Sequence, residues 1–236
     1  MAMTEIEFDD FLKNNFGIIK NDNGGNCDYR ISNFVPVGGG CMIPDGLGQP
    51  KCLLDLFGIM GYTTGAEIGV YEGQLSKRLC SRFTGTIYSI DPWWCFNKRI
   101  YSDGLTTNIT QEELDNRYHN VVKLLSGYNN SAIIRETSVA ALSYVERESL
   151  DFVYIDANHA HDFIWHDMRG WWEKIKHGGM LSGHDFCFVN KALTDFCYEK
   201  GIGQLYCDSG TIPPKLVPYD GGYSFWRDED WLIYKK

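Results

Sequence analysis

Mostly apolar runs alternate with amphipathic stretches from residue 51 onward. Apolar runs of three to five residues between turn residues predict buried strands, here at residues 66–70, 86–90, 132–135, 151–155 and 180–182. Between them, apolar residues recur every three or four positions, as on one helix face, and predict helices at residues 52–60, 74–83, 111–125 and 190–200. This alternation is typical of a mostly parallel sheet with crossover helices on both faces, so we predict an α/β fold.

The stretch after the fourth predicted strand shows the helical spacing most clearly. Its apolar residues lie four, three and four positions apart, namely Ile164, Met168, Trp171 and Ile175. Gly178 and Gly179 follow, and because glycine commonly terminates a helix, we expect this helix to stop there. Two further strands are predicted at residues 204–207 and 231–234, on either side of a loop rich in glycine and proline.

Two parts of the chain lack this regular pattern. Residues 1–50 contain one short amphipathic helix, residues 5–14, and then a stretch rich in glycine, asparagine and proline, which predicts a cap or lid. Residues 92–128 form an excursion between the second and third strands, and insertions of this kind usually shape a pocket. With 236 residues, the chain fits this cap followed by one α/β domain at residues 51–236.

Composition and charge narrow the functional classes. The formal net charge of -9 argues against binding to a nucleic acid or an anionic membrane, although an acidic protein can still carry a local basic patch. The eight cysteines contain no C-x-x-C pair, which argues against a zinc ribbon or a redox dithiol. The N-terminus lacks the features of a signal peptide, and no run of about 18 apolar residues occurs. We expect a cytoplasmic protein that acts on a small molecule, and a homodimer is compatible with this sequence.

Glycine and acidic residues occur where the predicted strands end. In an open parallel sheet, ligands bind beyond the carboxyl ends of the strands. The first strand leads into the turn Glu67-Ile-Gly69-Val-Tyr71-Glu-Gly73, whose glycines allow a ligand close to the backbone. This turn departs from G-x-G-x-x-G, which argues against a nicotinamide dinucleotide. Asp91 ends the second strand, where a carboxylate can accept hydrogen bonds from both hydroxyls of a ribose.

Taken in order, these motifs resemble the Rossmann-like (class I) S-adenosylmethionine-dependent methyltransferases. The resemblance rests on the E-x-G-x-x-x-G turn, on Asp91 before Pro92-Trp93, and on the later Ile-Asp156 and Gly178-Gly179, and it covers roughly residues 51–234. Two segments are also similar to the small-molecule methyltransferases grouped with macrocin O-methyltransferase and cephalosporin hydroxylase proteins. They are Tyr154-Ile-Asp-Ala-Asn-His159 and Lys176-His-Gly-Gly-Met-Leu-Ser-Gly-His184-Asp185.

This resemblance implies a doubly wound, mostly parallel seven-stranded sheet whose last strand is antiparallel, with S-adenosylmethionine as the methyl donor. It also implies a set of cofactor-binding residues. Gly69 and Gly73 would lie against the amino-acid portion of the cofactor, and Asp91 would bind the ribose. Trp93, Thr137 and Ser138 would lie near the adenine. The remaining members of the implied set are Glu67, Tyr71 and Asp156.

The resemblance further implies a divalent metal ion, often Mg²⁺, held by an aspartate after the fourth strand and an acidic pair after the fifth. Asp156 and Asp185 match two of these positions, but His184 replaces the first acid of the pair. Because imidazole suits Mg²⁺ less well than carboxylate does, either another metal binds there or none is needed. His159 stands where some sugar methyltransferases of this group carry a catalytic base.

The predicted function is methyl transfer to a hydroxyl of a small acceptor, a sugar or another natural product. His159, or a metal ion at Asp156 and Asp185, would remove the proton, and alignment of the two reactants would supply much of the rate. Two alternatives stay open: a non-catalytic nucleoside-binding protein, and a metal-dependent hydrolase in which His161 joins these residues. The interpretation without a functional role is that His161 and His166 are solvated helix residues and that Asp156 and Asp185 cap helices.

Overall fold

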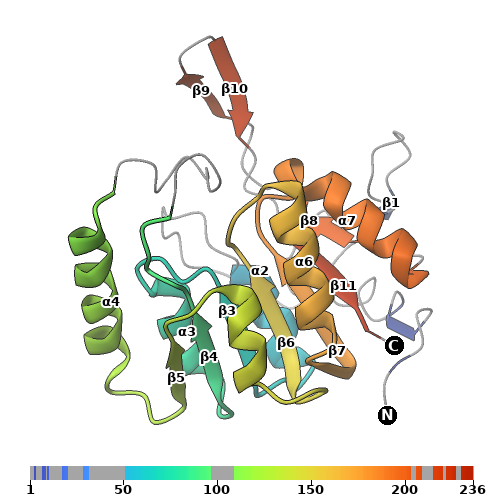
Figure 1. The fold of residues 1–236 in the computed structure, drawn as a ribbon. Helices are drawn as coiled ribbons and strands as arrows, with labels where there is room; N and C mark the ends of the chain where they lie inside the picture. The colour runs from blue at the N-terminus through green and yellow to red at the C-terminus, as the bar shows by residue number, and fades with distance from the viewer. Residues whose placement is uncertain are drawn as a thin grey trace.

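The computed structural model describes residues 3, 7–8, 10, 18–20, 29–31, 51–96, 109–202, 206–208, 215–219, 222–226 and 230–235. Its centre is a sheet flanked by helices (Figure 1). Five strands of this sheet are parallel, namely β3 (Gly65–Ile68), β4 (Ile87–Ile90), β5 (Ser131–Ile134), β6 (Leu150–Ile155) and β7 (Ile175–Gly183). A sixth, β11 (Trp231–Tyr234), lies antiparallel between β7 and β8 (Tyr206–Asp208).

These seven strands have the order β5-β4-β3-β6-β7-β11-β8. The chain enters at β3, builds outward to β5 and then returns to the other side of β3 with β6. The winding therefore reverses between β3 and β6, and ligands bind at such a switch point in open α/β sheets. The predicted doubly wound sheet with an antiparallel strand is confirmed. Two short strands, β1 (Ile18–Lys20) and β2 (Tyr29–Ile31), extend it to nine strands, with β2 parallel to β8.

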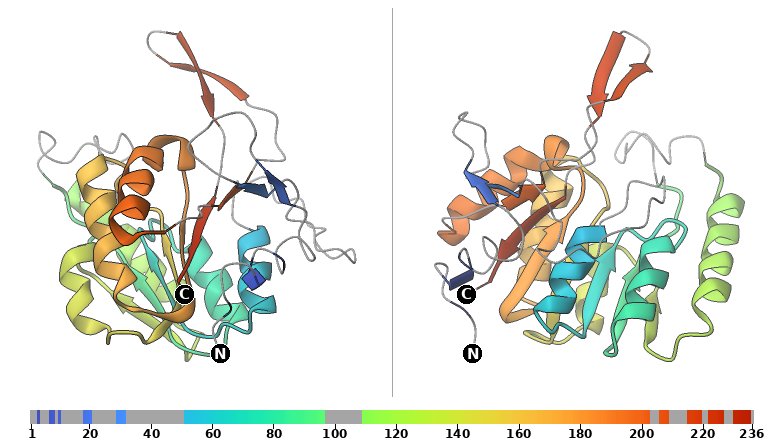
Figure 2. Two further views of the ribbon diagram at one scale, coloured as in Figure 1. Left: turned by 90° about the vertical axis from the view of Figure 1, so that its right-hand side faces the viewer. Right: turned by 180° about the vertical axis from the view of Figure 1, so that it is seen from behind.

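Helices cover both faces of the sheet (Figure 2). One face carries α2 (Lys51–Ile59), α3 (Gln74–Arg82) and α4 (Gln111–Leu125). The other carries α5 (Ser138–Ala141), the short 3-10 helix η1 (Leu142–Tyr144), α6 (His161–Trp172) and α7 (Phe186–Lys200). Side chains of β6 alternate between the faces, so Phe152 packs into the first core and Val153 into the second. Each face of the sheet therefore has its own hydrophobic core.

The element predictions agree closely with the structure where residues are described. Helix α4 has the predicted bounds because Thr110 and Glu113 form a capping box that fixes its first turn. Of the predicted helix at residues 5–14, residues 7, 8 and 10 are described, and they are helical. The domain boundaries, the N-terminal cap and the pocket-shaping role of residues 92–128 stay predictions. Among the described helices, none combines the length and apolar character needed to cross a membrane.

One hairpin and the end of one helix differ from expectation. The Gly- and Pro-rich loop contains β9 (Lys215–Tyr219) and β10 (Gly222–Trp226), which pair as a separate antiparallel hairpin. Helix α6 ends at Trp172 rather than at Gly178, and Ile175 already belongs to β7. The two glycines interrupt the register between β6 and β7, where Gly178 adopts a φ of 83°. This positive φ favours glycine in a strand bulge as much as at a helix end, which explains the wrong prediction.

Lys235 stabilises the point where α6 gives way to β7. Its ammonium group donates hydrogen bonds to the carbonyl oxygens of Trp172 (2.8 Å) and Ile175 (2.7 Å). Its backbone pairs with Gly178 and Gly179. Only 7% of the residue is exposed, and this burial lowers the pKa of the amine. Burying a lysine costs free energy unless its N–H groups are hydrogen-bonded. The two carbonyl oxygens therefore stabilise the buried ammonium group, and the ammonium group satisfies the two carbonyl oxygens.

Replacing Lys235 by Met should therefore lower the free energy of unfolding by about 2 to 3 kcal/mol, because two inward carbonyls lose their donor. Urea denaturation followed by circular dichroism measures the loss. Lys191→Met is the matched control, since Lys191 is exposed and pairs only along the surface of α7 with Asp195. That variant should be nearly unchanged. Equal losses in both variants would show that Lys235 does not support this junction.

Candidate active site

The turn between β3 and α3 has the backbone geometry that its glycines predict. Gly69, Tyr71 and Gly73 have φ values of 91°, 53° and 79°, all in the left-handed region. A Cβ atom on Gly69 would lie 2.1 Å from the carbonyl oxygen of Asp156. Gly73 is the N-cap of α3 and offers no side-chain acceptor to the first N–H groups of this helix. This arrangement can bind an anionic group such as a carboxylate.

Asp91 joins this turn to the end of β4. Its Oδ2 accepts hydrogen bonds from the N–H groups of Val70 and Tyr71 (3.0 Å each), and its Oδ1 accepts one from Trp93 (2.8 Å). Burial raises the pKa of Asp91, while these backbone hydrogen bonds and the charge of Arg117 oppose the rise. A carboxylate oxygen can accept about two hydrogen bonds, so Oδ1, which accepts one from Trp93, has capacity for a ribose hydroxyl.

Trp93 lies beside Asp91 but turns into the core. Only 2% of it is exposed; its indole N–H donates to the carbonyl oxygen of Tyr71 (3.0 Å), and its ring lies 5.3 Å from that of Tyr118. Tyr71 is 46% exposed and has the guanidinium of Arg117 4.3 Å above its ring. The side chain of Trp93 therefore packs in the core beneath the turn that contains Tyr71. Its predicted contact with adenine stays a prediction.

Glu67 lies beneath the glycine turn. Its carboxylate accepts a hydrogen bond from Ser76 of α3, whose hydroxyl also lies 2.7 Å from that of Ser89 in β4. Burial raises the pKa of Glu67 well above its usual range, although the hydrogen bond from Ser76 opposes the rise. The side chain thus links β3, α3 and β4 below the predicted cofactor site. Its direct contact with a cofactor stays a prediction.

Thr137 and Ser138 follow β5 at the same edge of the sheet. The hydroxyl of Thr137 accepts a hydrogen bond from the N–H of Ala140 and so caps α5. The hydroxyl of Ser138 accepts one from the indole N–H of Trp171 in α6 (2.8 Å). Both hydroxyls therefore have local partners, and the predicted adenine contact of these two residues stays a prediction.

The four residues predicted for chemistry lie close together after β6 and β7. The acidic oxygens and imidazole nitrogens of Asp156, His184 and Asp185 lie within 4.8 Å of one another, a spacing that could hold a metal ion. His159 adjoins this trio, with Nε2 3.3 Å from Asp185 Oδ2 and 3.7 Å from Asp156 Oδ1. We call these four residues the Asp-His cluster. The parallel pairing of β6 with β7 brings its members together.

Neither aspartate of the Asp-His cluster is occupied as a helix cap. Helix α6 begins after Ala160, well beyond Asp156, and has no side-chain cap. Asp185 is the N-cap residue of α7 and has a left-handed φ of 55°, yet its side chain makes no capping hydrogen bond. Such a backbone conformation is strained for a residue other than glycine, and strain of this kind concentrates at functional sites. The carboxylate of Asp185 is thereby directed to the two imidazoles.

The charges of the Asp-His cluster reinforce one another. Burial lowers the pKa of His184, but the hydrogen bond with Asp185 and the charges of Asp230, Asp156 and Asp185 raise it to about 9. For His159 too, burial lowers the pKa, and the contacts with Asp156 and Asp185 reverse that and raise it. The pKa of Asp185 falls below its usual range because the two imidazoles outweigh its burial. The site thus favours ionised carboxylates beside a cation.

Several buried polar atoms at this site lack a hydrogen-bond partner. Within the described part of the chain, they include Asn158 Nδ2 and Asp185 Oδ1, and Nε2 of His159 makes only the longer contacts given above. Asn158 is 3% exposed, and its Oδ1 accepts a hydrogen bond from the N–H of Ala160 (2.8 Å), which leaves its amide hydrogens. Buried polar groups are nearly always paired in native proteins, so these atoms fit a site built for a bound ligand or ion.

The other histidines of α6 lie outside the cluster. His161 pairs with Asp162 (3.1 Å) and with Asp195 of α7 (2.9 Å) at the surface. His166 packs edge-on against the neighbouring Trp165. This agrees with their interpretation as solvated helix residues, and it deprives the hydrolase alternative of His161 as a ligand. Asn158 and Arg135 escaped the sequence reasoning, although both lie within a few residues of a strand end, the same signal that marked Asp91.

The methyltransferase domain family matches residues 66–186 of the chain. The chain belongs to this family. The prediction of a class I, S-adenosylmethionine-dependent methyltransferase is thus confirmed at the level of the family. The match begins in β3 and ends at the start of α7, so it contains the glycine turn, Asp91 and the whole Asp-His cluster. None of the curated proteins compared with the chain matches it.

Solved structures of this fold resemble the methyltransferase at low sequence identity. The O-methyltransferase TomG from Streptomyces achromogenes, solved with S-adenosylmethionine, is 13% identical with a TM-score of 0.54, over 83% of this chain and 82% of that one. The O-methyltransferase from Bacillus cereus, solved with S-adenosylhomocysteine, is 13% identical with a TM-score of 0.51, over 85% and 84%. Precorrin 8w decarboxylase from Methanobacterium thermoautotrophicum is 16% identical with a TM-score of 0.51, over 83% and 100%. At these identities the likeness shows the fold alone.

The close approach of Gly69 to Asp156 can be tested by adding a single methyl group. Gly69→Ala would place Cβ against the backbone of Asp156 at a positive φ, so we expect about 3 kcal/mol or more of lost stability and no binding of S-adenosylhomocysteine. Thermal unfolding and calorimetry measure the two effects. Gly61→Ala is the control, because Gly61 also has a positive φ (72°) but open space around its Cβ position, and it should lose about 1 kcal/mol. Equal effects would refute the close approach.

Proposed function

We propose that this methyltransferase binds S-adenosylmethionine at the turn of Gly69 and Gly73 and transfers its methyl group to a hydroxyl of a small acceptor. The observation that carries the proposal is the position of the Asp-His cluster against that turn. The Asp156 backbone contacts Gly69, and its N–H donates to the carbonyl oxygen of Ile68 (2.8 Å). A methyl donor held by the turn would therefore present its reactive end to a base and two carboxylates.

The proposed reaction is a displacement at the methyl carbon. The acceptor oxygen forms a bond to this carbon, the bond from carbon to sulfur breaks, and its electron pair stays on sulfur. His159 accepts the hydroxyl proton on Nδ1, because Nε2 is the nitrogen that contacts Asp156 and Asp185. An alcohol is too weakly acidic to attack unaided. Asp156 and Asp185 orient the imidazole and stabilise the imidazolium that forms. Positive charge thus leaves sulfur and arrives on His159 between two carboxylates, so little net charge has to be created at the site.

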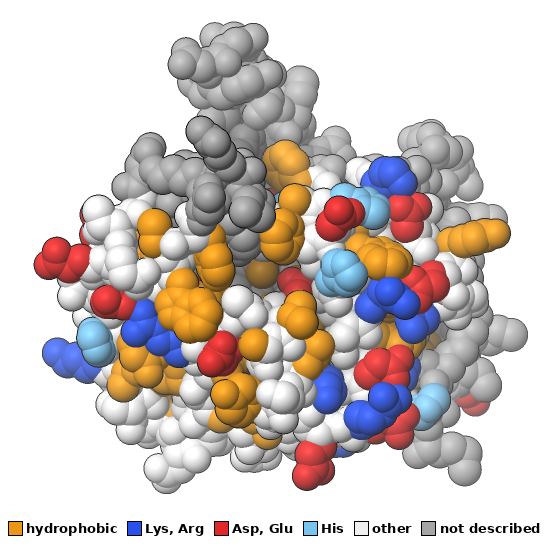
Figure 3. All heavy atoms as spheres, viewed as in Figure 1, with side chains coloured by type: hydrophobic (Ala, Val, Ile, Leu, Met, Phe, Trp, Pro, Cys, Tyr) orange, Lys and Arg blue, Asp and Glu red, His pale blue; other side chains and the backbone are white. Residues whose placement is uncertain are grey.

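The surroundings of His159 favour a small acceptor with a ring. Phe188, in the first turn of α7, is 53% exposed, and its ring stacks with that of His159 at a centroid distance of 6.3 Å. An exposed aromatic face beside a base can pack against a sugar or an aromatic ring. The net charge of -9 also fits a small molecule better than a nucleic acid, and basic side chains are interspersed with acidic ones on the face shown in Figure 3. We therefore keep a sugar or natural product as the acceptor class, in the cytoplasm.

Turnover of the acceptor tests the role of His159. With a panel of hexoses, sugar nucleotides, glycosides and catechols, release of S-adenosylhomocysteine should fall about 10²- to 10⁴-fold in His159→Ala. Binding of S-adenosylmethionine by calorimetry should stay within about twofold, because the base contacts the acceptor and not the donor. His161→Ala is the matched control, two residues further along at the start of α6, and it should keep full activity.

Three outcomes would contradict the proposal in different ways. Full activity in His159→Ala would remove the residue from the mechanism. Tight binding of S-adenosylmethionine with no turnover on any member of the panel would favour the non-catalytic nucleoside-binding protein. Hydrolysis of p-nitrophenyl acetate or phosphate that requires metal and not S-adenosylmethionine would favour the hydrolase.

A divalent metal ion is the second part of the proposal. Asp156, His184 and Asp185 would hold it, and the unpaired Oδ1 of Asp185 fits such a role. When bound, a cation lowers the pKa of a neighbouring hydroxyl. Two carboxylates and an imidazole form a donor set that suits Mn²⁺ better than Mg²⁺.

Metal titration tests this donor set. Isothermal titration should show Mn²⁺ binding more tightly than Mg²⁺ by about tenfold or more, because imidazole contributes little to Mg²⁺. His184→Asp restores an acidic pair, so it should shift the preference toward Mg²⁺, whereas Asp185→Asn should abolish binding of both. His177→Asp, at an exposed histidine in β7, controls for the added charge. Absence of binding by either ion would leave His159 as the base without a metal.

A further inference from the structure

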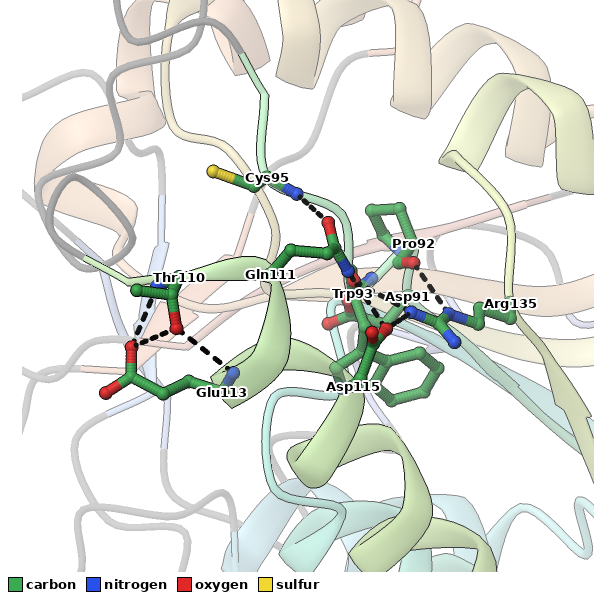
Figure 4. Close-up of polar contacts among 9 residues, drawn as sticks. All are labelled: Asp91, Pro92, Trp93, Cys95, Thr110, Gln111, Glu113, Asp115 and Arg135. Carbon is green, nitrogen blue, oxygen red and sulfur yellow. Dashed lines mark hydrogen bonds and ion pairs between the residues drawn. The ribbon is translucent and has the colours of Figure 1, made fainter.

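Two side chains of α4 and one that follows β5 form a hydrogen-bonded group beside the backbone just after Asp91 (Figure 4). Arg135, at the end of β5, donates to the carbonyl oxygens of Pro92 (Nε, 3.4 Å) and Trp93 (Nη2, 3.2 Å). Gln111, the first residue of α4, donates to the same oxygen of Trp93 (3.0 Å). Asp115 of α4 accepts hydrogen bonds from both Arg135 and Gln111. We call Gln111, Asp115 and Arg135 the loop clamp.

The loop clamp acts on a backbone that would not hold its shape alone. Trp93 has a φ of 42°, and a bulky residue in the left-handed region is strained. Its N–H nevertheless points to Asp91 Oδ1 (2.8 Å), while its carbonyl oxygen points away to Gln111 and Arg135. Hydrogen bonds therefore fix the orientation of both peptide groups that flank Trp93. Without the clamp, Trp93 would relax to a common conformation, and Asp91 would lose a donor that fixes its carboxylate.

Packing adds to the hydrogen bonds of the loop clamp. The guanidinium of Arg135 lies 4.6 Å above the ring of Tyr118, and Trp93 packs against the same ring. Gln111 also accepts a hydrogen bond from the N–H of Cys95 (2.9 Å) through its side-chain oxygen. Arginine suits this place because its planar group can donate in several directions and stack at once, which lysine cannot do.

We propose that Arg135 is a positioning residue for the ribose of S-adenosylmethionine, acting through Asp91 without touching the cofactor. The proposal rests on the proposed function, binding of S-adenosylmethionine at the glycine turn, and on the role that the sequence resemblance implies for Asp91, binding of the ribose hydroxyls. Arg135 holds the peptides of Pro92 and Trp93, these keep the Trp93 N–H on Asp91, and the carboxylate is thereby fixed before the cofactor arrives. Preorganisation of this kind increases affinity because little order has to be imposed on binding.

A double-mutant cycle tests this chain of contacts. Arg135→Met keeps an apolar stem over Tyr118 but removes every donor, so the Kd for S-adenosylhomocysteine should rise about tenfold. In an Asp91→Ala background, the same substitution should add less than about twofold, because its effect passes through Asp91. With an active acceptor, Arg135→Met should raise KM for S-adenosylmethionine and leave kcat unchanged. Arg135→Lys should recover only part of the affinity.

Controls separate positioning from general destabilisation. Arg147→Met removes an arginine whose ion pair with Glu173 lies at the surface, and its Kd should match the wild type. If Arg135→Met fails to fold by circular dichroism, Gln111→Leu replaces it, since Gln111 is exposed and shares the oxygen of Trp93. This variant should raise the Kd about threefold, again only when Asp91 is present.

Two results would overturn the inference. If losses of affinity from Arg135→Met and Asp91→Ala are additive, Arg135 does not act through Asp91. If the wild type and Arg135→Met bind equally well while Asp91→Ala does not, the proposed function stands and this inference fails. Failure of the wild type to bind S-adenosylhomocysteine would instead remove the proposed function, on which the inference rests.

Discussion

The carboxylate of Asp91 determines the backbone conformation after β3 and β4, where the cofactor is proposed to bind. A buried charge is stable only where it is surrounded by donors, and here the donors are backbone N–H groups of Val70, Tyr71 and Trp93. To supply them, the glycine turn adopts left-handed geometry and Trp93 accepts a strained φ. The turn after β3 and the loop after β4 thus take their shapes from one acid. The turn and the loop therefore form one structural unit around Asp91.

The Asp-His cluster follows a different rule. Its two carboxylates and two imidazoles come from neighbouring parallel strands, and the contacts among them are longer than ordinary hydrogen bonds. A set of polar groups that satisfied itself completely would have little capacity left for a ligand. The partly unpaired atoms of Asn158 and Asp185 therefore lie where the proposed ligand or metal ion would complete the network.

Much of the fold could be read from the sequence because each apolar run in the α/β core had a clear length and period. Helix α4 and strand β11 have their predicted bounds, and the Asp-His cluster brings together the residues that the family resemblance implied for chemistry. The end of α6 was wrong because a glycine pair is equally suited to a strand bulge, and only the partner strand decides between them. Arg135 and Gln111 escaped notice since their role depends on a contact between β5 and α4, which leaves no periodic signal.

The pairing of β2 with β8 joins residues far apart in the chain, with Tyr29 opposite Tyr206. Two further contacts are as distant in the sequence. The N–H of Met3 donates a hydrogen bond to the hydroxyl of Tyr234, and the ring of Phe8 stacks on the ring of Tyr234. Contacts this distant in sequence require the closure of long loops, which slows folding. During synthesis, β2 and Phe8 leave the ribosome well before β8 and Tyr234, so these contacts cannot form until the later residues have been made. In the nascent chain, β2 should therefore stay unpaired with β8, and accessible to chaperones and proteases, until β8 has been synthesised.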